Sequence, residues 1–153
     1  MSELNGLAVR HICCSENGVL WIARNGNNLL RVDTSTKTVT TLPIIAKTVS
    51  IDSAGVIYVI SADGRLLVSN DGQAGFRSLD GSVDEIVSNI DVSRILCVTG
   101  RLFLSTGNGF SYVVDLETFA VSAMESLVKA RDVLEHSSGE LWVATRDGIH
   151  VLG

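Results

Sequence analysis

Short apolar runs recur along the whole chain, and most are bounded by Asn-Gly, Asp-Gly or other glycine-containing pairs. Such runs predict strands joined by tight hairpins, because asparagine or aspartate before glycine tolerates the positive φ angles of these turns. Proline, which interrupts strand pairing, occurs only at Pro43. The pattern therefore predicts an antiparallel, all-β chain.

Four of these runs share one pattern, in which an aromatic residue follows a glycine by three positions. The glycines, at positions 18, 55, 100 and 139, lie 37, 45 and 39 residues apart. A period of about 40 residues with about four short strands in each period is typical of β-propeller repeats. We expect the aromatic residues to be buried at equivalent places, one in each repeat: Trp21, Tyr58, Phe103 and Trp142.

The repeats form one domain, residues 1–153, and cover approximately residues 8–45, 46–88, 89–129 and 130–153. The predicted first strands of the repeats are 9–15, 47–52, 92–98 and 131–136. The last repeat ends after its third predicted strand, and residues 2–7 are the candidate for the missing fourth. Two architectures fit this pattern: a small four-bladed ring closed within the chain, or an open array completed by self-association through an open blade edge.

Two segments carry the spacing of a helix-capping box: Ser82-Val-Asp-Glu85 and Ser122-Ala-Met-Glu125. For the first we predict a helical turn inside the long connection 80–91. The second competes with a fourth strand at 120–124, so a short helix near 124–129 and a strand remain equal alternatives.

Several segments resemble known propeller repeats. Residues 131–149, Arg-Asp-Val-Leu-Glu-His-Ser-Ser-Gly-Glu-Leu-Trp-Val-Ala-Thr-Arg-Asp-Gly-Ile, resemble the repeats of two-component-regulator propellers and of streptogramin lyases. Residues 69–76 resemble the Asp-box of sialidases and photosystem assembly propellers, although Gln73 and Phe76 depart from it. The segments starting at Val32 and Val114 resemble quinoprotein-like repeats. The resemblance implies a propeller fold, but such motifs occur in enzymes, sensors and scaffolds alike.

Composition and charge narrow the functional classes. Hydrophobic residues make up 46% and charged residues 19%, as in compact globular domains, and the net charge of −5 argues against general nucleic-acid binding. No apolar run reaches the length of a membrane span, so we expect no membrane association. The N-terminus lacks the pattern of a secretory signal, and the three cysteines, Cys13, Cys14 and Cys97, are an odd number. These features predict reduced thiols and a cytoplasmic location.

The residues typical of catalysis are scattered. The three histidines stand singly, no spacing matches a zinc site, and adjacent cysteines on a strand point to opposite faces. We expect Asp71 to hydrogen-bond its own backbone, and we expect no cofactor. The sequence favours a non-catalytic interaction module that presents propeller-face loops to a protein partner. A small propeller lyase or hydrolase, or a ligand-sensing domain with an axial anion site, is the alternative.

Two groups of residues are candidate binding sites. Alignment of the first strands places Arg10, Lys47 and Arg131 at one position, with Ser93 there in the third repeat. These residues predict an axial anion site, and the competing interpretation is that they are solvated strand ends. The connection 80–91 is the candidate loop for a protein partner, through its acidic residues Asp80, Asp84, Glu85 and Asp91.

Overall fold

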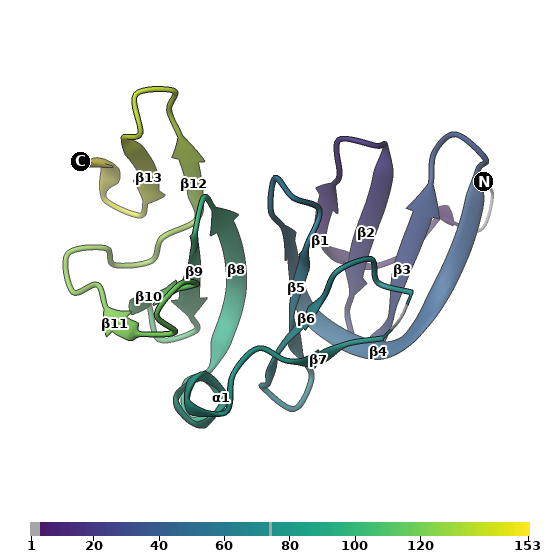
Figure 1. The fold of residues 1–153 in the computed structure, drawn as a ribbon, viewed down its shortest axis with the longest axis horizontal. Helices are drawn as coiled ribbons and strands as arrows, with labels where there is room; N and C mark the ends of the chain where they lie inside the picture. The colour runs from purple at the N-terminus through teal and green to yellow at the C-terminus, as the bar shows by residue number, and fades with distance from the viewer. Residues whose placement is uncertain (1–3, 74) are drawn as a thin grey trace.

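The computed structural model describes residues 4–73 and 75–153, which form antiparallel sheets and one short α-helix (Figure 1). The first sheet contains β1 (Val9–Cys14), β2 (Val19–Arg24), β3 (Asn27–Asp33), β4 (Thr38–Ile51), β5 (Ile57–Ser61), β6 (Leu66–Ser69) and β7 (Arg77–Ser78). The second contains β8 (Val92–Val98), β9 (Arg101–Thr106), β10 (Ser111–Asp115) and β11 (Val121–Ala123). The third contains β12 (Asp132–Glu135), β13 (Leu141–Thr145) and β14 (Gly148–Leu152). The helix α1 (Gly81–Val87) lies between the first two sheets in sequence.

Strands that are consecutive within a sheet pair with one another, so the prediction of an antiparallel all-β chain is confirmed. The strand β4 is 14 residues long, pairing with β3 through its first part and with β5 through its second. It therefore joins the predicted last strand of repeat one to the predicted first strand of repeat two. Pro43 lies in β4 where the register with β3 shifts, a place in a strand where a residue without an N–H group is tolerated.

The strand register gives the four repeats one common geometry. The aromatic residue of each second strand stands directly opposite a residue of the first strand: Cys13 with Trp21, Ser50 with Tyr58, Leu96 with Phe103, and Leu134 with Trp142. We call the side of a repeat that carries the aromatic residue its forward face, and the opposite side its back face.

The cores lie between successive repeats. The forward face of repeat one, with Trp21, packs on Val49 and Ile57 of the back face of repeat two. Tyr58 and Phe103 pack in the same way against repeats three and four. A single antiparallel sheet of this size cannot bury both of its faces, so each repeat relies on the next one for burial of apolar surface.

The helix α1 confirms the helical turn predicted in the connection 80–91. Its N-cap is Asp80, whose side chain accepts hydrogen bonds from the backbone amides of Ser82 and Val83, so the capping box predicted to start at Ser82 is wrong. Asp80, two residues before Ser82, is in the N-cap position, where a side-chain oxygen accepts hydrogen bonds from the free amides of the first helical turn. At 124–129 the chain makes turns after β11, so the strand alternative is right and the helix alternative is wrong.

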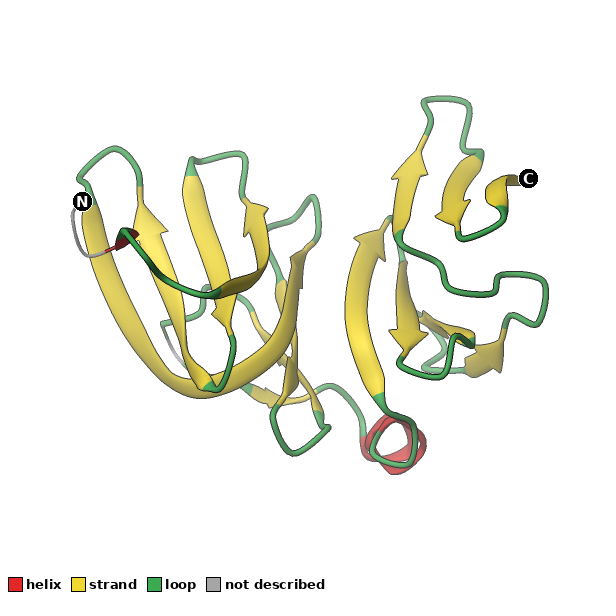
Figure 2. Cartoon of the chain, turned by 180° about the vertical axis from the view of Figure 1, so that it is seen from behind, coloured by secondary structure: helices red, strands yellow, loops and turns green. Residues whose placement is uncertain are grey.

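The repeats follow one another in an arc. Strand β1 packs beside β4, β4 beside β8, and β8 beside β12. Repeat one and repeat four lie at opposite sides of the molecule in both views (Figures 1 and 2). Leu4 and Leu7 pack on the back face of repeat one against Ile22, Leu30 and Val32, and β14 is an edge strand of its sheet. Residues 4–7 thus cover repeat one and do not pair with β14, while residues 2 and 3 lie outside the described residues.

Candidate binding surfaces

The four residues of the predicted anion site occupy equivalent places in the structure: Arg10, Lys47, Ser93 and Arg131. In repeats one to three this residue is the extra residue of a β-bulge in the first strand. In repeat four Arg131 directly precedes β12, and its amide donates to the carbonyl oxygen of Ala144 at 2.8 Å. A bulge re-aims the side chain of the extra residue, so alternation along the strand does not give its direction.

The structure brings one of these residues into an ion pair. The Nζ atom of Lys47 lies 3.3 Å from Oδ1 of Asp91, at the end of the predicted partner loop. Arg10, Ser93 and Arg131 are exposed, and Ser93 donates to the carbonyl oxygen of Ser105. An exposed ion pair stabilises a fold by only about 0.2–1 kcal/mol. A ligand shared by the basic residues stays a prediction.

The residues that come next along the first strands, after the bulges in repeats one to three and after Arg131 in repeat four, approach one another between neighbouring repeats. Nδ1 of His11 lies 2.6 Å from Oγ1 of Thr48, which also accepts from the amide of Ile95 at 3.2 Å. Between repeats three and four, Nη2 of Arg94 lies 4.0 Å from Oδ1 of Asp132. Burial lowers the pKa of His11, and the positive charge of Arg94 lowers it further. The sequence alignment singled out the bulge residues, which stand one position before the residues that meet. The error arises because a β-bulge cannot be recognised from the pattern of apolar positions.

The acidic residues of the connection 80–91 are partly engaged within the chain. Asp80 caps α1, and hydrogen bonds from Ser82 hold the pKa of its carboxyl below the usual value. Asp84 accepts a hydrogen bond from the hydroxyl of Ser78. Glu85 is exposed. With Asp91 paired to Lys47, three of the four acids have a structural role in the loop.

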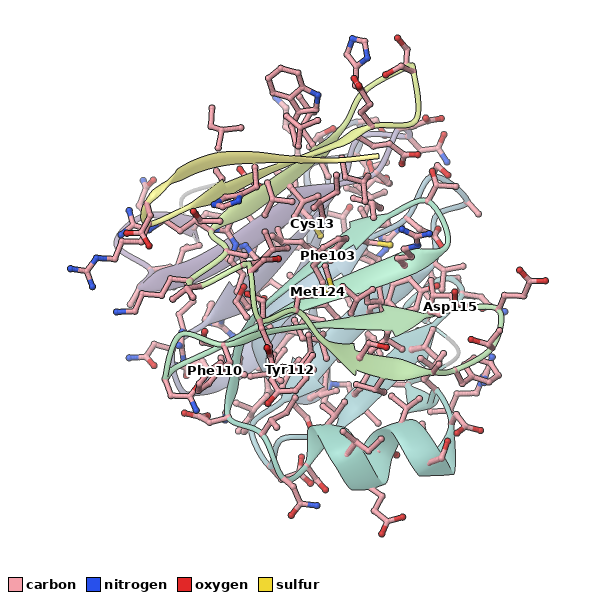
Figure 3. All side chains as sticks on the ribbon, turned by 90° about the vertical axis from the view of Figure 1, so that its left-hand side faces the viewer. Cys13, Phe103, Phe110, Tyr112, Asp115 and Met124 are labelled. Atoms are coloured by element: carbon pink, nitrogen blue, oxygen red, sulfur yellow. The ribbon has the colours of Figure 1, made fainter. Side chains whose placement is uncertain are left out.

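The forward face of repeat four is uncovered. Trp142 is 42% exposed, whereas Trp21, Tyr58 and Phe103 are 2%, 5% and 2% exposed at the equivalent positions. The prediction of burial is therefore right for three aromatic residues and wrong for Trp142, because no repeat packs on its face in the described residues. In Figure 3 the labelled Phe103 lies beneath the yellow strands of repeat four, and side chains on their far side project outward.

The uncovered side forms a continuous apolar surface, which we call the open face. We define it by four residues with their exposed fractions: Leu134 (67%), Trp142 (42%), Ile149 (67%) and Val151 (50%). A groove of about 500 Å³ runs over it, lined by Asp132, Val133, Leu134, Trp142, Ala144 and Ile149. Contiguous exposed apolar patches on soluble proteins mark binding sites. No sequence signal distinguishes this face, since repeats one to three carry the same pattern.

The described residues offer little for metal or thiol chemistry. Among these residues, no three side chains of histidine, cysteine, aspartate or glutamate lie close enough together to hold a metal ion. Burial raises the pKa of the Cys13 and Cys97 thiols to about 12, so both are neutral.

Asp71 accepts from the amide of Gln73 at 2.8 Å, as the sequence predicts. In the part of the chain that is described, the helical segment is too short to cross a membrane.

Comparison with known proteins rests on structure. No family model and no curated protein matches the sequence. The extracellular domain of the one-component system BT4673 from B. thetaiotaomicron is 18% identical with a TM-score of 0.68, covering 97% of this chain and 21% of that chain. YCF48 bound to D1 peptide is 15% identical, with a TM-score of 0.62 and coverage of 99% and 52%. BamB from Moraxella catarrhalis is 11% identical, with a TM-score of 0.63 and coverage of 92% and 42%.

These structures are propeller-type proteins. The chain has a propeller-type fold. It spans about a fifth of the BT4673 domain and about half of the YCF48 chain. Proteins of this fold are often interaction or sensing modules, and identities this low show the fold alone.

Proposed function

We propose that this chain is a non-catalytic protein-interaction module whose four repeats are successive blades, and that it binds a protein partner at the open face of repeat four. The observation that carries the proposal is the exposure of Trp142, at a position that is buried in the other three repeats. The partner's surface is a propeller-type back face, because a back face covers this position in repeats one to three.

The chemistry of the open face suits a protein partner. Leu134 and Val151 stand directly opposite Trp142 on the two neighbouring strands, and Ile149 lines the same groove as the indole. Burial of apolar surface contributes about 25 cal/mol per Å². A tryptophan at the centre of an apolar patch is the residue type that most often dominates binding energy at protein interfaces. The carboxylate of Asp132 at the edge of the groove adds a polar rim, which is the usual arrangement around an apolar contact.

Site-specific photo-cross-linking in cells tests the proposal. We place p-benzoylphenylalanine at position 134, on the open face, and at position 110 as the matched control. Leu134 is 67% exposed and Phe110 is 53% exposed, but Phe110 lies in the turn between β9 and β10, away from repeat four (Figure 3). We expect irradiation to give one protein adduct of defined mass from position 134 and none from position 110. The proposal fails if position 134 gives no adduct or gives the same products as position 110.

A further inference from the structure

The two ends of the arc carry opposite halves of one kind of contact. At the far end, the open face is a forward face that none of the described residues covers. At the near end, Ile12 lies on the back face of repeat one, in the position that Val49 and Ile95 occupy in repeats two and three. Val49 and Ile95 are 1% and 0% exposed beneath the preceding repeat, whereas Ile12 is 53% exposed. The arc therefore has an exposed forward face at one end and an exposed back face at the other, and these are the two kinds of face that pack together between successive repeats.

Charge at the two ends is also complementary. Within the arc, residues at the same place after the bulge approach one another from neighbouring repeats, as His11 and Thr48 do and as Arg94 and Asp132 do. Continued by one step past repeat four, this row sets Asp132 opposite His11 of a following repeat one, with Arg10 beside it. A carboxylate that faces the guanidinium of Arg10 favours the docking of these ends and sets their register.

The two ends of the arc do not cover each other within one chain. Leu134 on the open face is 67% exposed, and Ile12 on the back face of repeat one is 53% exposed. A second copy related by a two-fold axis satisfies both ends at once, because each copy gives its forward face to the other and receives the other's back face. Such a pair contains two identical contacts and leaves no end uncovered.

We propose that the partner of the open face is a second copy of this chain, docked through the back face of its repeat one to form a closed pair. The inference rests on the proposed function, since it names the protein that the open face binds. Leu4 and Leu7 already cover Ile22, Leu30 and Val32 of that back face. The contact therefore centres on Ile12 and Val9, the part of the face that Leu4 and Leu7 leave exposed.

The molar mass in solution tests the pair directly. The chain has a mass of 16.3 kDa, and light scattering after gel filtration should give twice that value. Leu134→Asp changes the open face and Ile12→Asp changes the back face of repeat one, and each should halve the measured mass. Phe110→Asp places the same charge at a comparably exposed apolar residue away from both ends and should keep the mass of the pair. Circular dichroism checks that each variant keeps its strands.

Mixing the two end variants tests how the faces combine. Alone, each variant carries an aspartate in both contacts of its pair. An equimolar mixture of Leu134→Asp and Ile12→Asp can form a pair in which one contact holds both aspartates and the other is wild type. We expect the mixture to recover part of the doubled mass. If Ile12→Asp leaves the mass unchanged while Leu134→Asp halves it, the contact joins two open faces and the inference is wrong.

The remaining outcomes separate this inference from the proposed function. A wild-type mass of 16.3 kDa, or a mass that grows without limit as concentration rises, overturns the closed pair. If the cross-link from position 134 then joins the chain to a different protein, the interaction module stands and only the second copy falls. If position 134 gives no protein adduct at all, both fall.

Discussion

Repeats three and four show how one sequence pattern gives two environments. In both, the aromatic residue of the second strand stands opposite a leucine of the first strand, Leu96 opposite Phe103 and Leu134 opposite Trp142. Phe103 is 2% exposed because repeat four packs on it, and Trp142 is 42% exposed because none of the described residues packs on its face. The burial of a side chain in a stacked array is therefore a property of its neighbour as much as of its own repeat.

The largest expected difference between the two faces is in the loss of stability on truncation. Phe103→Ala should lower the free energy of unfolding by about 3–5 kcal/mol, because it leaves a cavity between two repeats. Trp142→Ala should cost about 1–2 kcal/mol, because much of the indole is already in water. Denaturant titration in the Ile12→Asp background measures both losses without a contribution from association. Equal losses would show that the open face is covered in the single chain.

The repeated pattern allowed much of the fold to be predicted from sequence. Glycine-aromatic spacing located the second strands, and the alignment of first strands placed Arg10, Lys47 and Ser93 at structurally equivalent bulges. The bulges themselves were not predictable, because an extra residue in a strand depends on pairing with a partner strand. The exposure of Trp142 could not be predicted either, since its repeat has the same pattern as the others and differs only in that none of the described residues packs on its forward face.

A second prediction concerns how Trp21 is covered by repeat two. A methyl group added at Gly72 would lie 2.0 Å from the ring of Trp21, and the φ of Gly72 is +67°. Gly72→Ala should therefore cost about 2–4 kcal/mol, from backbone strain and from overpacking against the indole. The matched control is Gly64→Ala, where φ is +87° and nothing lies within 4 Å, so that strain alone should cost about 1–2 kcal/mol. Similar losses in the two variants would mean that Gly72 does not hold Trp21 in place.

A third, smaller effect compares two equivalent positions opposite the aromatic residues. The hydroxyl of Ser50 accepts a hydrogen bond of 2.9 Å from the amide of Cys97 in the following repeat. Ser50→Ala should cost about 1–3 kcal/mol, because that amide loses its partner in a partly buried contact. Leu134→Ser, at the same place in repeat four, should change the stability of the single chain by less than about 0.5 kcal/mol, since Leu134 is 67% exposed. A large loss for Leu134→Ser would argue against an open end.

The smallest expected effect is a dependence of stability on pH that arises between repeats one and two. Burial lowers the pKa of His11 from its ordinary value of 6.5, and the charges of Arg94 and Arg10 act in the same direction against the opposing carboxylate of Asp132. Below pH 6.5 the unfolded chain therefore binds this proton more readily than the folded chain does. The contribution of neutral His11 to stability is complete above pH 6.5 and is lost progressively as the pH falls toward the lowered value. Denaturation midpoints of wild type and His11→Gln between about pH 7.5 and 5.5 measure the effect, which the substitution should remove, whereas His136→Gln at an exposed histidine should leave it in place. An unchanged slope in His11→Gln would place the source of the pH dependence elsewhere than in the contact of His11 with Thr48.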